Sequence, residues 1–235
     1  MAARVIAVTG ASRGIGAAIA DELLKRGFVV GSLTRSATGR EGTVPIACDV
    51  NDGESLKKAF KTLANKAGRI DGLVNNAGIH LDGKSAELPT ARFDEVMATN
   101  ARAVFVACRE AYPHLEKNGG TIVNIGSFFD KLGVKRNLAY CASKAAVGAI
   151  TRCLAVEWAG KGIRVLNVAP GYIETELNAQ AMQGALRPFL QSRVPTGGPG
   201  STADVARLVA GLFIENIPFL TGETIYLDGG QGMAH

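Results

Sequence analysis

Short apolar runs that favour strands alternate with segments that favour helices along the whole chain, and this alternation constrains the fold most strongly. Beta-branched runs bounded by glycine and polar residues predict buried strands. They occupy residues 4–9, 28–33, 44–48, 70–76, 120–127, 163–169 and 224–227. Apolar residues recur at helical spacing in residues 15–25, 52–67, 90–116 (with a break near Asn100), 138–159 and 202–215. Because such alternation is typical of parallel sheets, we predict an α/β, doubly wound parallel sheet of about seven strands with helices on both faces.

The length and composition of the chain predict a single domain that spans residues 1–235. The sequence has 235 residues, of which 47% are hydrophobic, and this is enough apolar material for a sizeable core. Folds of the α/β class commonly reach this length without dividing, and no linker or internal repeat interrupts the pattern. Residues 176–200 contain several Pro and Gly residues, so we predict irregular structure and a mobile lid there.

Composition and charge argue against several classes of protein. No apolar run approaches the ~18 residues of a membrane span, and the N-terminus lacks a signal-peptide pattern, so we expect a cytoplasmic protein without membrane association. The four cysteines and three histidines have no metal-binding spacing, which predicts neither a metal site nor a disulfide framework. The net charge of +5 comes from dispersed residues, so we expect no nucleic-acid partner.

A glycine-rich segment joins the first predicted strand to the first predicted helix. Its sequence is Gly10-Ala-Ser-Arg-Gly14-Ile-Gly16. In this context, bare backbone amides and a helix N-terminus can bind a phosphate group. The spacing G-x-x-x-G-x-G departs from the commoner G-x-G-x-x-G, and three glycines can also form an ordinary tight turn. The strand before and the helix after favour phosphate binding.

Several polar or glycine-containing segments directly follow predicted strands. In parallel α/β sheets, ligands bind in a crevice at the carboxyl ends of the strands. The segments are residues 10–16, Asp49, Asn75–Gly78, Ser127 and Pro170–Thr175. They are therefore expected to converge on one crevice.

Tyr140 and Lys144 lie four residues apart at the start of a predicted helix. This spacing stacks the two side chains on one face, with Cβ atoms roughly 5–6 Å apart. A free tyrosine has a pKa near ~10, and a charge about 4 Å away favours the phenolate by at most about 4 kcal/mol at a dielectric near 20. That corresponds to roughly three pK units, which would bring the pKa of the phenol close to the working range of a general acid–base group. Taken alone, the pair is more typical of a surface tyrosine beside a solvated lysine, so its function depends on the rest of the chain.

The ordered set of these motifs resembles the short-chain dehydrogenase/reductase family over essentially the whole chain. The likeness is to its single-domain members of the 3-oxoacyl-carrier-protein reductase and carbonyl reductase types. The motifs are Thr9–Gly16, Asp49-Val50, Asn75–Gly78, Asn100, Ser127, Tyr140-x-x-x-Lys144 and Pro170-Gly171. The resemblance implies a Rossmann-type fold and an oxidoreductase that transfers a hydride between a nicotinamide cofactor and a carbonyl or secondary alcohol.

The resemblance also implies four catalytic residues. Tyr140 would be the general acid or base, and Lys144 would lower the pKa of the tyrosine and bind the nicotinamide ribose. Ser127 would orient and polarise the substrate oxygen. Asn100 would hold a water that links Lys144 to solvent; the alternative is an asparagine that bonds a backbone carbonyl within a helix.

The resemblance also implies a set of cofactor-binding residues. Most of them lie in the segments that follow the predicted strands, and two are Tyr140 and Lys144. They are Gly10, Ser12, Arg13, Gly14, Ile15, Gly16, Thr34, Arg35, Asp49, Val50, Asn76, Ala77, Gly78, Tyr140, Lys144, Pro170, Gly171, Ile173 and Thr175.

The residues after the second predicted strand bear on the choice of cofactor. An NAD-preferring member usually presents an acidic residue there, but this chain has Thr34 followed by Arg35. Arg35 and Arg13 can form charge-assisted bonds to a 2′-phosphate. We therefore predict a preference for NADP(H), with NAD(H) as the alternative if both arginines point into solvent.

The sequence says less about substrates and assembly. Aromatic and apolar residues in segments that line the substrate cleft of the family suggest an apolar pocket; they are Phe128, Phe129, Tyr172, Leu177, Met182 and Phe189. His80 could touch the substrate or be an ordinary loop histidine. Small residues recur on two predicted helices and suggest a homodimer or homotetramer; they are Ala101, Ala103, Ala107, Ala111, Ala142, Ala145, Ala149 and Ala155.

Three alternative functions remain open. One is an NAD-dependent alcohol dehydrogenase of the same family. Another is a dinucleotide-binding sensor without turnover, although a sensor would not need the set of Asn100, Ser127, Tyr140 and Lys144. The third is an isomerase or dehydratase, whose relatives usually carry a larger C-terminal substrate domain.

Overall fold

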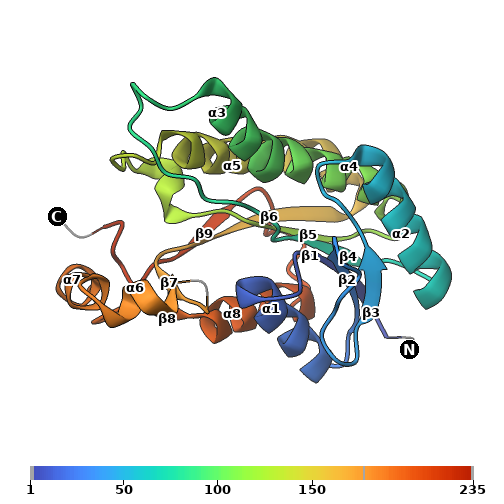
Figure 1. Ribbon diagram of the computed structural model, residues 1–235. Helices are drawn as coiled ribbons and strands as arrows, with labels where there is room; N and C mark the ends of the chain where they lie inside the picture. Colours follow the sequence, from blue (N-terminus) through green and yellow to red (C-terminus); the bar gives the residue numbers. More distant parts are fainter. Residues whose placement is uncertain (1–2, 177, 234–235) are drawn as a thin grey trace.

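A seven-stranded parallel sheet forms the centre of the protein, with the strand order β3-β2-β1-β4-β5-β6-β9. The structure, a computed structural model, describes residues 3–176 and 178–233 (Figure 1). The strands are β1 (Val5–Thr9), β2 (Val29–Thr34), β3 (Val44–Ala47), β4 (Gly72–Asn75), β5 (Gly120–Ile125), β6 (Ile163–Pro170) and β9 (Thr224–Leu227). The predicted doubly wound α/β sheet is confirmed.

Helices cover both faces of this sheet (Figure 1). One face carries α1 (Gly14–Lys25) and α8 (Thr202–Ile214), and the other carries α2 (Gly53–Ala67), α4 (Ala103–Leu115) and α5 (Leu138–Trp158). Alternate residues of β1 show why its sequence is apolar throughout. Val5 and Ala7 belong to one buried cluster, whereas Ile6 and Val8 belong to the other. No helix in the described ranges combines the length and apolar character needed to cross a membrane.

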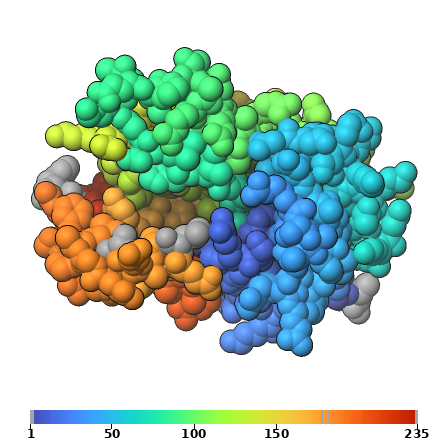
Figure 2. Space-filling model, viewed as in Figure 1, coloured from blue at the N-terminus to red at the C-terminus, as the bar shows by residue number. Residues whose placement is uncertain are grey.

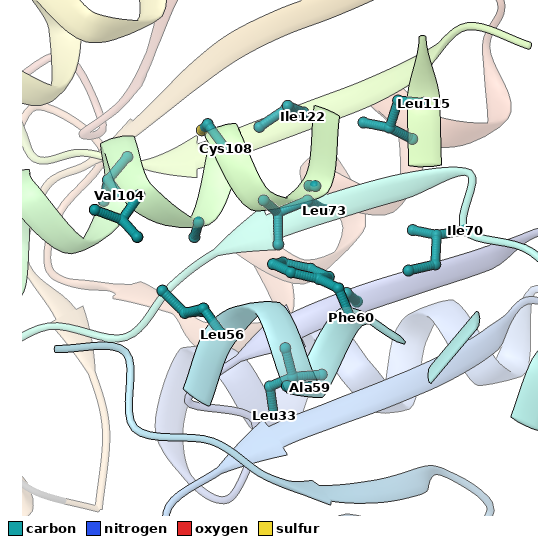
Figure 3. Packing of buried hydrophobic residues seen from close by; sticks show 14 of the residues in the cluster. Leu33, Leu56, Ala59, Phe60, Ile70, Leu73, Val104, Cys108, Leu115 and Ile122 are labelled. Carbon is teal, nitrogen blue, oxygen red and sulfur yellow. The ribbon is translucent and has the colours of Figure 1, made fainter. Parts of the chain in front are cut away.

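The predicted helix at residues 52–67 is confirmed as α2, and its apolar residues are buried against the sheet. Asp52 caps the N-terminus of α2 by accepting a hydrogen bond from the Glu54 N–H, and Gly68 ends the helix with a left-handed φ of 81°. Between these ends, the buried residues of α2 point toward the sheet. Figure 3 shows Phe60 at the centre of this packing, close to Leu73 of β4 and facing side chains from α4.

The predicted break near Asn100 is confirmed as a change of helix type. Helix α3 (Thr90–Met97) runs into a π-helical turn over Ala98–Arg102, and α4 follows directly. A π-helical turn inside a helix is frequently found at functional sites, because it displaces one turn of backbone from the regular ladder.

The prediction of irregular structure for residues 176–200 was wrong. The segment contains α6 (Ala179–Gln183) and α7 (Leu186–Arg193), and short strands β7 (Ile173–Glu174) and β8 (Gly200–Ser201) pair at its base. Met182, Leu190 and Val194 form a buried cluster of their own, against which Leu186 packs. These four residues recur every four positions, so a helical signal was present in the sequence and was masked by the Pro and Gly residues around it.

The alanines of α4 are not a surface for assembly, contrary to the prediction. Ala101, Ala103, Ala107 and Ala111 are all buried within this chain. Their small side chains let α4 approach the sheet, where Ala107 and Ala111 belong to the larger core cluster. On α5, Ala155 is likewise buried, whereas Ala145 and Ala149 are exposed.

The strand order reverses at β1, whose neighbours are β2 on one side and β4 on the other. Such a reversal opens a crevice at the carboxyl ends of the strands, where ligands bind in this class of fold. Figure 2 shows a hollow on this side of the molecule, between the green segment around α3, the orange segment of α6 and α7, and the blue N-terminal part.

Candidate active site

The turn between β1 and α1 is a bare backbone surface. Gly10 and Gly14 have φ angles of 66° and 57°, a left-handed conformation that favours glycine. A Cβ atom on Gly16 would lie 2.3 Å from the carbonyl oxygen of Gly10, so no side chain fits there. Ser12 and Arg13 are exposed at the tip of the turn, and Ile15 packs against the core below it.

The N-terminus of α1 has no side chain to satisfy its amides. Arg13 occupies the N-cap position without a capping hydrogen bond, and the first turn contains no acidic residue. The first backbone N–H groups of a helix lack partners within the helix, and the helix dipole makes this end favourable for anions. The glycine turn and this helix end therefore fit the pyrophosphate of a dinucleotide.

The Asn-Asn-Ala-Gly segment after β4 is fastened to the glycine turn. The Thr9 hydroxyl accepts hydrogen bonds from the backbone N–H groups of Asn76 and Ala77, at 3.0 and 3.1 Å. The amide of Asn76 donates to the carbonyl oxygens of Thr9 and Gly10. These bonds place the two predicted cofactor segments side by side.

The predicted cofactor residues after β2 and β3 each make local contacts. Val50 lines a small pocket together with Thr9 and Ala77. The hydroxyl of Thr34 donates to the carbonyl oxygen of Thr38, so this side chain is used within its own loop. The carboxylate of Asp49 accepts a hydrogen bond from the backbone N–H of Asn51.

Two arginines are exposed at this end of the crevice. They are Arg13 at the start of α1 and Arg35 directly after β2. No carboxylate forms an ion pair with either of them in the described part of the chain. In the same loop, by contrast, Arg40 is paired with Asp21 at 2.9 Å.

Tyr140, Lys144 and Ser127 meet at the carboxyl end of β5. The Lys144 ammonium donates to the carbonyl oxygen of Ile125 at 2.8 Å and lies 5.6 Å from the centre of the Tyr140 ring. Ser127 caps a short 3₁₀ helix over Phe128–Lys131, where its hydroxyl accepts a hydrogen bond from the Phe129 N–H. The predicted stacking of tyrosine and lysine on one face of a helix is confirmed.

The pKa of Tyr140 is shifted in the direction opposite to our expectation. Burial raises the pKa of its phenol, and the interaction with the Ser127 side chain offsets only part of this effect. Lys144 does not reverse the shift, because its ammonium is directed to Ile125. Burial also lowers the pKa of Lys144 to about 8, which weakens its charge in mildly alkaline solution.

The Asn100 side chain, in the π-helical turn, bonds backbone groups of the loop after β4. Its Oδ1 accepts from the N–H of Ile79 and its Nδ2 donates to the carbonyl oxygen of the same residue, both at 2.8 Å. Nδ2 also donates to the Ser143 hydroxyl, which in turn donates to the carbonyl oxygen of Tyr140. The amide thus clamps the chain after Gly78 and links it to α5.

The segment after β6 lines the opposite wall of the crevice. β6 ends at Pro170, and the Gly171 N–H donates to the carbonyl oxygen of Leu227. Ile173 is buried in β7, and the methyl group of Thr175 would lie 4.0 Å from a Cβ atom on Gly14. Thr175 therefore lies next to the glycine turn, at the start of α1.

Aromatic rings surround the Tyr140 phenol on several sides. Phe129 lies 6.0 Å from both Tyr140 and Tyr172, measured between ring centres, and Phe128 lies 5.6 Å from Tyr172. Of the other predicted pocket residues, Met182 is buried inside the α6–α7 cluster and Phe189 is 49% exposed on its outer side. Leu177 lies outside the described residues.

His80 and Asn137 are site residues that the sequence identified poorly or missed. The ring of His80 lies 4.8 Å from that of Tyr140, and its Nε2 hydrogen-bonds to the Oδ1 of Asn137. His80 follows the Asn-Asn-Ala-Gly segment, which is a positional signal, but nothing in the sequence marks Asn137. The described residues also contain no cluster of three or more side chains suited to hold a metal ion.

Comparison with known proteins decides the family. A family model described as enoyl-(acyl carrier protein) reductase matches residues 10–231. D-threitol dehydrogenase of Mycolicibacterium smegmatis is 33% identical over 239 residues, which cover 97% of this chain and 92% of that protein. The chain belongs to the short-chain dehydrogenase/reductase family.

Further relatives support the same family and fold. The 3-oxoacyl-[acyl-carrier-protein] reductase of Vibrio harveyi is 34% identical over 239 residues, and 98% of each chain is covered. The solved structure of ElxO with NADP bound is 32% identical, has a TM-score of 0.90 and covers 98% of this chain and 99% of its own. As a short-chain dehydrogenase/reductase, the protein is an oxidoreductase of a family that binds nicotinamide dinucleotides and acts on alcohol, carbonyl or ketoacyl groups.

Proposed function

We propose that this short-chain dehydrogenase/reductase transfers a hydride between NADP(H) and a carbonyl or secondary alcohol, with Tyr140 as the general acid–base group. The observation that carries the proposal is the position of the Tyr140 phenol beside Ser127 and Lys144, at the carboxyl end of β5. This site adjoins the bare glycine turn that fits a dinucleotide. When bound, the nicotinamide would supply the hydride; the protein supplies position, polarity and the proton.

The raised pKa of Tyr140 suits the reductive direction. Because burial raises the pKa of the phenol, the phenol stays protonated at neutral pH and is able to donate its proton to the oxygen of a carbonyl. Ser127 is within reach to bond the same oxygen and polarise the carbonyl. In the oxidative direction, Tyr140 would have to be a phenolate to accept the alcohol proton, so oxidation should be favoured at higher pH than reduction.

Lys144 would stabilise the phenolate as it forms and bind a cofactor ribose hydroxyl. An ammonium has three N–H donors, and only one is used by the Ile125 carbonyl. The water relay expected at Asn100 would have to use the backbone of the π-helical turn, since the amide is occupied by Ile79 and Ser143.

The preference for NADP(H) over NAD(H) rests on the two exposed arginines. Arg35 and Arg13 have no paired carboxylate among the described residues, and Arg guanidinium groups form bidentate bonds to phosphate. Thr34 presents no negative charge that would repel a 2′-phosphate. A relative of the same fold has been solved with NADP bound.

Residues 176–200 would serve as the substrate lid. The lid helices contact the rest of the chain through an ion pair between Arg187 and Glu174, at 2.6 Å, and through packing on Tyr172, and the residues at the end of α7 lie beside Gly229. These are few contacts compared with those of the core helices, so the segment can open without unfolding the sheet.

Assembly into a homodimer or homotetramer would cover apolar surface that this chain leaves exposed. Phe105 on α4 and Val156 on α5 are 42% and 81% exposed. β9 forms one edge of the sheet, and Phe219 in the loop before it is fully exposed. Exposed apolar surface next to an unpaired strand edge is typical of a subunit interface.

The proposed function is tested by a screen of ketones, aldehydes, 3-oxo compounds and alcohols, followed at 340 nm with NADPH/NADP and NADH/NAD in parallel. We expect turnover of at least one class, with a higher kcat/KM for NADPH than for NADH. Equal or better use of NADH would overturn the cofactor assignment and favour an NAD-dependent alcohol dehydrogenase. Tight cofactor binding without turnover of any compound would favour the non-catalytic sensor.

A further inference from the structure

His80 is an exposed side chain that lies against the Tyr140 phenol, and the proposed mechanism does not use it. The two ring centres are 4.8 Å apart and the rings are inclined by 76°, so an edge of one ring meets a face of the other. A substrate whose oxygen reaches Tyr140 would therefore pass beside the imidazole.

The backbone next to His80 is held rigidly by the site itself. Both polar backbone groups of Ile79 are bonded to the amide of Asn100, at 2.8 Å each. The same amide is bonded through Ser143 to the first turn of α5, on which Tyr140 lies. The positions of His80 and Tyr140 are thus set by one common element.

The side chain of His80 is held by a hydrogen bond to Asn137. This bond determines which ring nitrogen of His80 donates and which one is left as an acceptor. Asn137 donates through Nδ2 to the carbonyl oxygen of Lys135 at 2.9 Å, which orients its amide and turns Oδ1 toward His80. The Nε2 atom of His80 must then be the donor to Oδ1. In the neutral ring, the remaining Nδ1 is an acceptor, and it receives no hydrogen bond from the described residues.

The loop that carries Asn137 forgoes more favourable local arrangements. Asn137 is the N-cap residue of α5, but its side chain bonds His80 instead of capping the helix. Arg136 has a left-handed φ of 67°, which is unfavourable for a residue other than glycine. Two more contacts join the loops: Arg136 pairs with Asp82 at 2.9 Å, and the Gly83 N–H donates to the carbonyl oxygen of Arg136.

We infer that His80 is a substrate-binding residue that accepts, through Nδ1, a hydrogen bond from a hydroxyl group on the carbon next to the reacting carbon. The substrate class that fits is therefore a hydroxyketone, or the vicinal diol that its reduction yields. This inference rests on the proposed function and names the substrate group that the Tyr140 site selects.

The test compares 3-hydroxybutan-2-one with butan-2-one, which differ by one hydroxyl group, as substrates for NADPH-linked reduction. We expect the wild type to prefer the hydroxyketone in kcat/KM by about tenfold, the value of one good hydrogen bond. His80→Phe keeps an aromatic ring but has no acceptor, so the preference should fall to about one. His80→Asn places an oxygen near the position of Nδ1 and should restore part of the preference.

Lys84→Ala is the matched control, because Lys84 lies exposed on the same loop and pairs only with Glu87. This variant should keep the wild-type preference. An equal preference in the wild type and in His80→Phe, or no preference in the wild type, would overturn the inference.

A second measurement does not depend on turnover. Calorimetric titration of the NADPH-bound enzyme, which cannot oxidise an alcohol, with butane-2,3-diol and with butan-2-ol gives the ratio of the two dissociation constants. A ratio that favours the diol in the wild type and is lost in His80→Phe supports the inference even if neither ketone is reduced, whereas the absence of turnover would count against the proposed function. A ratio unaffected by His80→Phe rejects the inference.

Discussion

Lys144 is the residue at which stability and the proposed chemistry conflict most directly. Its ammonium is buried and bonded to one backbone carbonyl, and burial lowers its pKa from 10.5 to about 8. Carrying this charge into the folded state costs on the order of 3 kcal/mol at neutral pH, since each pKa unit corresponds to about 1.4 kcal/mol. Buried charges are retained at functional sites although they destabilise the folded protein. Replacing such a charge by an apolar side chain therefore raises the free energy of unfolding.

Replacement of Lys144 by Met should therefore stabilise the protein at pH 7. The lost bond to the Ile125 carbonyl offsets about 1 kcal/mol, so we expect a net gain of about 2 kcal/mol in the free energy of unfolding. Between about pH 8 and 10.5, the unfolded wild type binds more protons than the folded one, so wild-type stability rises with pH relative to the variant. The advantage of Lys144→Met should shrink across this range.

Urea denaturation at pH 7, 9 and 10 measures this difference. Lys135→Met, at an exposed lysine three residues before the start of α5, is the control and should show no such pH dependence. The contrary outcome is a difference in the free energy of unfolding between Lys144→Met and the wild type that stays constant or grows with pH. Such a result would show that Lys144 is not buried as a charge.

Arg35→Asp tests the proposed cofactor preference at the level of one residue. Loss of a charge-assisted bond and the introduction of a repelling carboxylate should lower kcat/KM for NADPH by about 10- to 100-fold relative to NADH. Arg40→Asp makes the same change of charge in the same loop, but the Arg40 guanidinium is already paired with Asp21. If both variants changed the ratio equally, net charge rather than a specific contact would explain the preference.

The residues of the candidate site were predictable to different degrees. Tyr140 and Lys144 share a helix, so their spacing alone predicted that they stack. The direction of the Tyr140 pKa shift was not predictable, because it depends on burial by rings from distant segments. The same applies to His80 and Asn137, which are brought together by the fold and not by any local pattern.

At the scale of elements, α6 and α7 form a separate small cluster above the crevice. Leu190 is fully buried there, whereas its neighbour Phe189 is about half exposed. Because the cluster is small and lies apart from the two main cores, its loss should open the lid locally and leave the sheet folded.

Leu190→Ala should therefore raise KM for the carbonyl substrate several-fold and speed amide hydrogen exchange in residues 179–194. Removal of a buried leucine costs about 2–5 kcal/mol, which exceeds what such a small cluster can lose and remain closed. Phe189→Ala is the matched control and should change neither quantity. Equal exchange in both variants and the wild type would argue against a lid that opens as a unit.

The central strands were predictable because they are buried on both faces. β1, β4, β5 and β6 are continuous apolar runs because both faces of the sheet are covered. Their short length distinguishes them from buried helices, which are longer. The lid helices were missed because the Pro and Gly residues around them masked the four-residue repeat of Met182, Leu186, Leu190 and Val194. The alanines of α4 were wrongly predicted to form a subunit interface, because small residues suit a close contact with a sheet as well as one with another subunit.

At the scale of the whole molecule, exposed apolar surface near β9 and on α4 and α5 predicts self-association. We expect light scattering at micromolar concentration to give the mass of a dimer or tetramer. Phe219→Asp should lower this mass, because a carboxylate cannot be buried in an apolar interface without a partner. An exposed lysine remote from these surfaces, Lys57 on α2, provides the control Lys57→Asp. A monomeric wild type would contradict the proposed assembly.

The central claim is that Tyr140 is the group that transfers the proton. The most direct test compares Tyr140→Phe with the wild type in single-turnover reduction with NADPH and in cofactor titration by fluorescence. The variant keeps the ring contacts with His80 and Phe129, so we expect unchanged NADPH affinity and a rate at least about 10²-fold lower. A variant that reduces its substrate at the wild-type rate would contradict the account.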